Sequence, residues 1–432
     1  MNTENINKAY ELAKEQFASM GIDTEAVISS LEKIPISLHC WQTDDVAGFE
    51  NAGDLGGGLQ VTGNYPGKAR NIDEVRADLE KSLSLIPGSH KVNLHAIYGD
   101  FSKGQPERCD IDTCHFDSWI DWAKENGVGL DYNGTFFSHP MADTNFTLSS
   151  KDKTIRDYWI EHAKKSRKIT EYIGVKLGRT CVNNLWIPDG YKDIPADKYA
   201  HRAILKEALD EIFKDKYTSK YAIDAFESKL FGVGVESYTV TSNEFVLAYC
   251  MSQPDVIVTF DAGHFHPTEE IEDKLSSVLT FKDHILLHIS RGVRWDSDHV
   301  VILNDQLKGI MEQVVRLGTD KIFIALDYFD GSINRCGAIV TGMRAGIKAL
   351  MIAMLEPLSL MKKAEDDAQY FERLAIMEEA KFLPFDAVWN YYCMKQDVPC
   401  GFDWIKECSD YQTKVAKERD NIFNIIKNYI GL

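Results

Sequence analysis

The chain has 432 residues, of which 44% are hydrophobic, and it carries a formal net charge of -18. This hydrophobic content is enough for a large core, whereas the acidic excess argues against a surface that binds nucleic acid. Apolar runs such as residues 349–355 are far shorter than the roughly 20 residues that cross a bilayer, so no membrane segment is predicted. The N-terminus lacks a signal region and the cysteines form no C-x-x-C pair, which predicts a cytoplasmic protein with reduced thiols.

The chain then alternates between strand and helix patterns. Residues 5–31 predict two helices with a break near Gly21. Eight short apolar or β-branched runs predict strands at residues 36–39, 92–95, 129–133, 182–186, 222–227, 256–261, 285–288 and 322–327. Helical patterns lie between them, for example at residues 72–85, 116–124, 155–177, 201–213 and 307–317. Eight strands alternating with helices are typical of a parallel (β/α)8 TIM barrel, an α/β fold.

After the eighth strand only helical patterns remain, at residues 347–355, 368–383 and 422–430. They predict a C-terminal helical extension that packs on the outside of the barrel or on a neighbouring subunit. The glycine-rich residues 48–68 predict a long loop over the barrel mouth. The predicted organisation is therefore an N-terminal helical segment (1–35), a catalytic barrel (36–344) and the extension (345–432).

Ligand-type side chains end the last four predicted strands: Glu227, Asp261, His288 and Asp327. In a closed parallel barrel these carboxyl ends meet at one mouth, within roughly 10 Å of one another. Any one of them alone is explained as a capping residue of the next loop, but recurrence on strand after strand argues against that alternative. Three carboxylates with one imidazole suit Mn²⁺, Mg²⁺ or Co²⁺, whereas tetrahedral zinc sites more often use thiolates or three histidines.

A second group of candidate ligands consists of His264, Asp296 and Asp298. The Asp-x-Asp pair points both carboxylates at one ion only if its loop folds inward. Two groups on the same strands predict a two-metal site, in which one ion holds substrate oxygens and the other polarises the reacting carbon. We place His266 and His299 around these ligands rather than among them.

Three more residues are predicted to line the mouth. Lys229 follows Glu227 by two positions and is a candidate electrophile beside a carbonyl group, the alternative being a solvated lysine after a strand. His95 and Trp186 end the second and fourth strands and are candidates for substrate contact, the alternative for both being core packing, which is the commoner role of a tryptophan. Residues 63–69 contain residue types of a phosphate-binding loop, and residues 109–115 contain those of a zinc site. Both segments lack the required spacing.

Several long stretches resemble the L-rhamnose isomerase family, and the resemblance covers essentially the whole chain. The matching segments are residues 37–50, 62–70, 93–98, 185–190, 227–232, 261–269, 293–300 and 333–335. The resemblance implies a metal-dependent barrel enzyme that interconverts L-rhamnose and L-rhamnulose, usually with Mn²⁺. It also implies a cytoplasmic homotetramer.

The resemblance also assigns residues to roles. The family's manganese ligands match His264, Asp296 and Asp298, and the structural-metal ligands of the wider xylose-isomerase-like group match Glu227, Asp261, His288 and Asp327. The substrate-contacting lysine of that group matches Lys229. We expect two divalent ions per subunit, with Co²⁺, Zn²⁺ or Mg²⁺ as substitutes for Mn²⁺. The expected reaction is a metal-assisted hydride shift from C2 to C1 of the open-chain sugar, with Asp327, a water molecule and His95 assisting ring opening.

Other functions are compatible with the same residues. An isomerase of this barrel type with a different preferred sugar is one alternative. A barrel metallohydrolase, including a nuclease, is another, but its mouth should be basic and this chain is strongly acidic. A sugar-binding or metal-storage protein built on the same barrel is the non-enzyme alternative.

Overall fold

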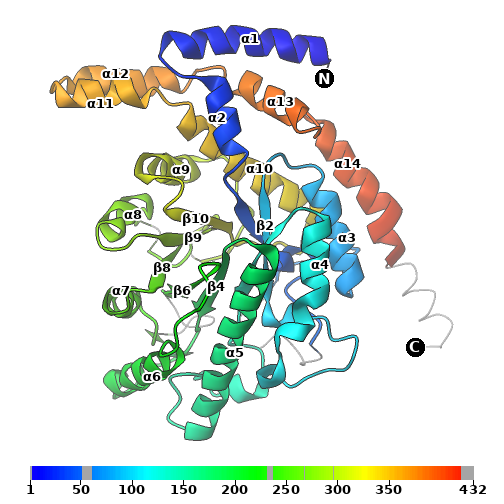
Figure 1. Cartoon of the computed structure of the whole chain (residues 1–432), viewed down its shortest axis with the longest axis vertical. Helices are drawn as coiled ribbons and strands as arrows, with labels where there is room; N and C mark the ends of the chain where they lie inside the picture. Colours follow the sequence, from blue (N-terminus) through cyan, green and yellow to red (C-terminus); the bar gives the residue numbers. More distant parts are fainter. Residues whose placement is uncertain (1, 51–60, 231–236, 267, 295, 420–432) are drawn as a thin grey trace.

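The computed structural model describes residues 2–50, 61–230, 237–266, 268–294 and 296–419. Its centre is a closed barrel of eight parallel strands in the order β1-β10-β9-β8-β6-β4-β3-β2 (Figure 1). These strands are β1 (Ile36–His39), β2 (His90–His95), β3 (Gly129–Asn133), β4 (Cys181–Trp186), β6 (Ala222–Glu227), β8 (Val256–Asp261), β9 (Ile285–Ile289) and β10 (Ile322–Leu326). The predicted (β/α)8 barrel is confirmed, with every predicted strand within two residues of its observed start and end.

Helices surround the barrel as a ring, visible around the strands in Figure 1. The ring contains α3 (Ile72–Leu83), α4 (Asp117–Glu125), α5 (Lys153–Leu177), α6 (Lys198–Ile212), α7 (Asn243–Ser252), α8 (Glu272–Leu279), α9 (Asp305–Leu317) and α10 (Arg335–Met354). Sequence patterns found most of them, but α7 and α8 were not among the predicted helices.

The N-terminal helices and the C-terminal extension are also confirmed, and they lie together outside the ring (Figure 1). They are α1 (Thr3–Ser19), α2 (Thr24–Leu31), α11 (Leu358–Asp366), α12 (Tyr370–Ala380), α13 (Phe385–Lys395), α14 (Asp403–Tyr411) and a π-helical turn at Gln412–Ala416. The rings of Tyr10 and Tyr391 stack with centroids 3.6 Å apart, joining α1 to α13. The helix predicted at residues 422–430 lies outside the described residues.

Helix α10 spans one predicted domain boundary. It runs unbroken from Arg335 to Met354 and packs on β1 and β10, so the boundary placed between residues 344 and 345 falls inside it. Because α10 is apolar on nearly every side, its sequence has no amphipathic pattern to mark its start. Within the described chain, α10 is also the one helix whose length and composition match a membrane span, and 78% of its apolar window is buried inside the protein.

A short two-stranded sheet, which the sequence did not predict, lies beside the barrel mouth. It pairs β5 (Gly190–Tyr191) with β7 (Tyr238–Thr239) in antiparallel fashion. Just after β7, the carbonyl of Thr241 accepts a hydrogen bond from the backbone N–H of Lys229 at 2.9 Å. The small sheet therefore fixes the backbone that carries a predicted site lysine.

A buried histidine holds α5 against the loop after β3. The ring Nε2 of His162 is hydrogen-bonded to the carbonyl of Gly134, and the neighbouring Thr135 hydroxyl lies 3.2 Å from Nδ1 of His95 at the mouth. Burial lowers the pKa of His162 to about 3, so the folded protein keeps this ring neutral.

We expect His162 to make the fold acid-sensitive. Its pKa is lower in the folded than in the unfolded chain, so unfolded molecules bind the proton first as the pH falls below 6.5. The free energy of unfolding then loses roughly 1.4 kcal/mol per pH unit from this residue, down to its folded pKa. Chemical denaturation at pH 7.5 and 5.5 should show that His162→Gln is less stable than the parent by a margin that shrinks at the lower pH. An unchanged margin would contradict this assignment.

Candidate metal centre

The carboxyl ends of the barrel strands surround a small cavity. Its walls combine carboxylates, an imidazole, an ammonium group and two indole rings. They are formed by Trp41, Asn133, Trp186, Glu227, Lys229, Asp261, His264, Asp298 and Asp327. Most of the site residues predicted from sequence therefore lie in one place, and Trp41 and Asn133 join them.

One group of candidate ligands consists of Glu227, Asp261 and His288, which come from β6, β8 and β9. One oxygen or nitrogen of each lies within 4.8 Å of the others, and all three side chains are buried. Nδ1 of His288 is 3.2 Å from Oε2 of Glu227 and 4.0 Å from Oδ2 of Asp261. The adjacent positions of β6, β8 and β9 in the barrel explain this convergence.

A second group contains Asp261, His264 and Asp296, again with ligand atoms within 4.8 Å of one another. Nε2 of His264 is 3.4 Å from Oδ2 of Asp296. The loop after β9 does fold inward, since Asp298 also lines the cavity, and Asp298 adopts a φ of 39° to do so. Asp261 belongs to both groups, so the geometry allows one carboxylate to face two ions.

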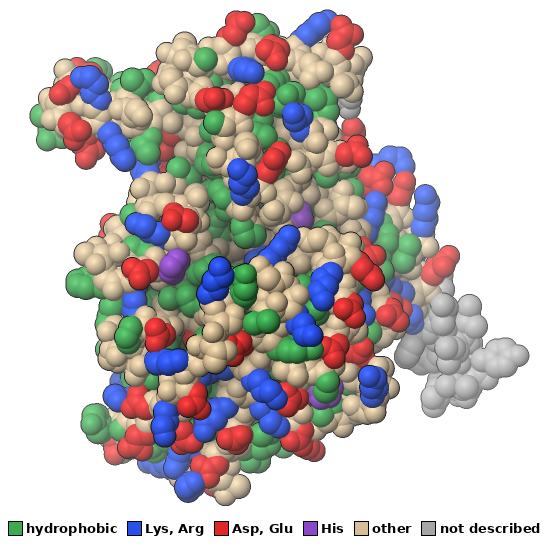
Figure 2. Space-filling model, viewed as in Figure 1, with side chains coloured by type: hydrophobic (Ala, Val, Ile, Leu, Met, Phe, Trp, Pro, Cys, Tyr) green, Lys and Arg blue, Asp and Glu red, His purple; other side chains and the backbone are tan. Residues whose placement is uncertain are grey.

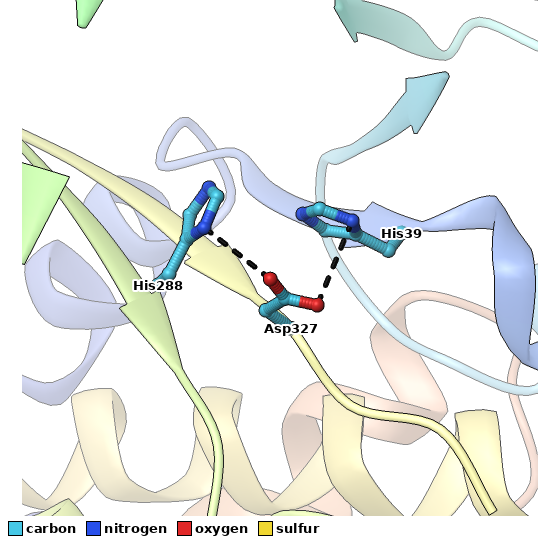
Figure 3. A group of neighbouring side chains, drawn as sticks. All are labelled: His39, His288 and Asp327. Carbon is cyan, nitrogen blue, oxygen red and sulfur yellow. Dashed lines mark ion pairs between the residues drawn. The ribbon is translucent and has the colours of Figure 1, made fainter. Parts of the chain in front are cut away.

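A third group, which the sequence analysis missed, joins His39 to His288 and Asp327 (Figure 3). The Asp327 carboxylate lies between the two rings, with Oδ1 3.6 Å from Nδ1 of His39 and Oδ2 3.4 Å from Nδ1 of His288. Barrel closure pairs β1 with β10 and brings the ends of these two strands together. His39 ends a predicted strand, so the strand-end rule applied to β1 would have found it.

The predicted substrate-contact residues flank these groups. His95 is buried, with Nε2 3.4 Å from Nδ1 of His39, and its ring stacks on Trp41 with centroids 4.3 Å apart. The ring of Phe137 contacts both His95 and Trp186, and the Trp186 ring lies 5.4 Å from the Nζ of Lys229. Packing and substrate contact are compatible for both residues, because each is held by aromatic neighbours and lies at the mouth.

Lys229 is largely enclosed beside the second group, with its side chain 11% exposed, rather than solvated. Its Nζ donates hydrogen bonds to Oδ2 of Asp296 and to Nε2 of His264, the latter at 3.0 Å. Burial opposes the charge, but the carboxylates of Asp296 and Asp298 outweigh it and raise the pKa of Lys229 above its ordinary value. The alternative of a solvated lysine is therefore wrong, and the ammonium points at the cluster.

The donor set fits divalent cations. Within the described residues, several buried atoms of the cluster have no hydrogen-bond partner: Nε2 of His39, Nδ1 and Nε2 of His288, Oδ1 of Asp296 and Oδ1 of Asp327. Buried polar atoms without partners are costly, and coordination to a cation satisfies them. Carboxylate and imidazole ligands without thiolates suit Mn²⁺, Mg²⁺ or Co²⁺.

Backbone and charge add to this fit. A Cβ at Gly263 would lie 2.5 Å from Oδ1 of Asp296 and 3.3 Å from Oδ1 of Asp261. Only glycine therefore lets these two carboxylates approach the backbone at residue 263 so closely. Burial, together with the charges of Glu227 and Asp327, raises the pKa of Asp261 to about 7 against the attraction of His264. The cluster has more negative charge than its own cations balance, and bound cations would relieve the repulsion.

The whole chain was compared with known families. The model of the L-rhamnose isomerase family matches residues 4–419. The chain belongs to the L-rhamnose isomerase family.

Individual sequence relatives are also named L-rhamnose isomerases. An L-rhamnose isomerase of Listeria monocytogenes is 52% identical over 96% of this chain and 99% of its own length. One from Rhodopirellula baltica is 50% identical over 96% and 98%. Among solved structures, an L-ribulose 3-epimerase shares 12% identity, covers 76% of this chain and 96% of its own, and has a TM-score of 0.48.

Two histidines of the L-rhamnose isomerase motifs lie away from the ligand groups. His266 is exposed and its Nδ1 lies 2.7 Å from the hydroxyl of Thr268, while His299 interacts with Ser297 at 2.9 Å. Their place around the ligands therefore stays a prediction. Figure 2 shows acidic and basic side chains intermixed over the visible face rather than gathered by sign.

Proposed function

We propose that this chain catalyses the interconversion of L-rhamnose and L-rhamnulose. Membership of the L-rhamnose isomerase family over residues 4–419 carries the proposal, and the convergence of ligand-type residues at the barrel mouth supports it. A barrel metallohydrolase is not favoured, because the family match points to an aldose-ketose isomerase.

The proposed cofactor is Mn²⁺, with two ions per subunit. Glu227, Asp261, His288 and Asp327 would hold one ion, and His264, Asp296 and Asp298 the other, with Asp261 close enough to both groups to contribute to each. When bound, the ions supply the positive charge that holds neighbouring sugar oxygens and polarises the carbonyl.

The chain's own side chains would prepare and orient the open-chain sugar. The Lys229 ammonium can donate a hydrogen bond to a carbonyl oxygen at C1 or C2, adding to its polarisation. Burial lowers the pKa of His95 to about 3, so its ring is neutral and would assist ring opening by a hydrogen bond that orients the sugar. Trp186 and Trp41 form apolar walls. Hydrogen then passes between C2 and C1 as a hydride, a route that needs no strong base.

We further propose that the protein acts in the cytoplasm as a homotetramer. The family resemblance supports this assembly. Exposed apolar side chains on α12, such as Phe371 and Leu374, are compatible with contacts between subunits.

The decisive experiment is ketose formation from L-rhamnose before and after EDTA treatment, with Mn²⁺ then added back. We expect the activity of the chelated protein to fall by about a hundredfold or more and to return when Mn²⁺ is added.

The same assay with L-lyxose and L-mannose ranks alternative sugars. Absence of turnover in metal-loaded protein would overturn the proposal, and stoichiometric solvent tritium in the early ketose would exclude the hydride shift.

A further inference from the structure

Beneath the candidate ligands, the barrel interior changes from apolar to polar. Val182, Ala225, Ile257, Leu286 and Ala325 form a buried apolar layer across five strands. Two residues further along their strands come Asn184 and Thr259, 1% and 0% exposed. Side chains two positions apart on a strand share a face, so both point inward, as do the candidate ligands Glu227 and His288, which follow Ala225 and Leu286 by the same two positions.

Asn184 contacts a candidate ligand directly. Its Nδ2 donates a hydrogen bond to Oε2 of Glu227 at 2.5 Å. Its Oδ1 accepts one from the Thr259 hydroxyl at 2.8 Å. Strands β4 and β8 flank β6, so Asn184 contacts Glu227 from one neighbouring strand and is itself held by Thr259 from the other.

The direction of these hydrogen bonds follows from the chemistry. An amide can turn by 180°, but the turned form would point Oδ1 of Asn184 at the Glu227 carboxylate, where two acceptors repel. The Thr259 hydroxyl donates to Oδ1 and so favours the orientation in which Nδ2 faces Glu227. An N–H donor favours an ionised carboxylate, which is the form that binds a cation.

Glu227 in turn faces both groups of candidate ligands. Its Oε1 lies 3.0 Å from Nδ1 of His264 and its Oε2 lies 3.2 Å from Nδ1 of His288. At the far side of its ring, Nε2 of His264 lies 3.0 Å from Nζ of Lys229 and 3.4 Å from Oδ2 of Asp296. Rotation of the Glu227 carboxylate would therefore disturb both groups at once.

We propose that Asn184, oriented by Thr259, is the positioning residue of the metal centre: it holds the Glu227 carboxylate in the one orientation that serves both ions. This inference rests on the proposed metal-dependent function, but it concerns ion binding and not the sugar. Partners behind the ligands typically change metal affinity by about 10–100-fold, which sets the size of the effect.

The test is calorimetric titration of the metal-stripped full-length protein with Mn²⁺, without sugar. We expect Asn184→Ala to weaken Mn²⁺ binding by about 10–100-fold and Thr259→Val by about 3–10-fold, whereas Thr259→Ser, which keeps the hydroxyl, stays within about threefold of the parent. The activity of Asn184→Ala should recover largely when Mn²⁺ is raised, because the loss is in ion affinity.

The neighbouring Asn183 provides a matched control. It is on the same strand and equally buried, but its Nδ2 donates to Asp224, away from the mouth. Asn183→Ala should lower thermal stability without changing Mn²⁺ affinity. Asn184→Ala with the affinity of the parent would overturn the proposal, as would an equal loss in Asn183→Ala. Tight Mn²⁺ binding without conversion of L-rhamnose would reject the proposed function and leave this inference standing.

Discussion

Replacing Glu227 by glutamine is expected to reduce kcat/KM for L-rhamnose by about a thousandfold or more, equivalent to ~4 kcal/mol of transition-state stabilisation. Glutamine keeps the shape of the side chain but removes the negative charge that faces His264 and His288 at 3.0 and 3.2 Å. Because Glu227 lies between both groups of ligands, metal content per subunit should fall together with activity. Steady-state kinetics and elemental analysis of the purified variant measure the two effects.

A carboxylate on the same strand provides the control for this change. Asp224 is also buried, but it pairs with Arg167 at 2.9 Å near the start of β6. We expect Asp224→Asn to lower stability while the folded fraction keeps its metal and its kcat. Full activity in Glu227→Gln would contradict the assignment of Glu227 as a ligand, and loss of metal in Asp224→Asn would show that carboxylate replacement on β6 acts through the fold.

Replacing Lys229 by methionine is expected to reduce kcat by about a hundredfold or more, because the ammonium no longer polarises the carbonyl. The affinity for Mn²⁺, in contrast, should stay the same or increase. Lys229 pairs with Asp296 and donates to His264, so its removal frees two candidate ligands from a competing cation. We therefore expect Lys229→Met to bind Mn²⁺ at least as tightly as the parent, with the loss confined to turnover.

A lower kcat together with undiminished Mn²⁺ binding would distinguish a catalytic role of Lys229 from a structural one. If Lys229 only neutralised the carboxylates, methionine would destabilise the metal-free protein, and Mn²⁺ would restore both stability and kcat. The comparison requires thermal melting and kinetics of the parent and Lys229→Met with and without saturating Mn²⁺. Recovery of kcat at saturating Mn²⁺ would contradict a direct role for the ammonium.

Local patterns along the chain were enough to predict the barrel and the kind of chemistry at its mouth. Alternating strand and helix periods predicted the eight strands, because each strand must be buried between the barrel interior and the helices around it. Ligand-type residues at the ends of strands predicted a metal site, because those ends meet at one mouth. Spacing along the chain also placed His264 and the Asp-x-Asp pair near the first group.

Which of these residues contact one another depends on how the whole chain folds. Barrel closure brings His39 of β1 beside Asp327 after β10, although 287 positions of the chain separate them. Other contacts also join separate strands or loops. Asp261 belongs to two ligand groups, Lys229 pairs with Asp296, and Asn184 donates a hydrogen bond to Glu227. Local periodicity reports which face of a strand is buried, whereas these contacts depend on the stagger between strands and on loop conformations, which are set by packing of the whole barrel.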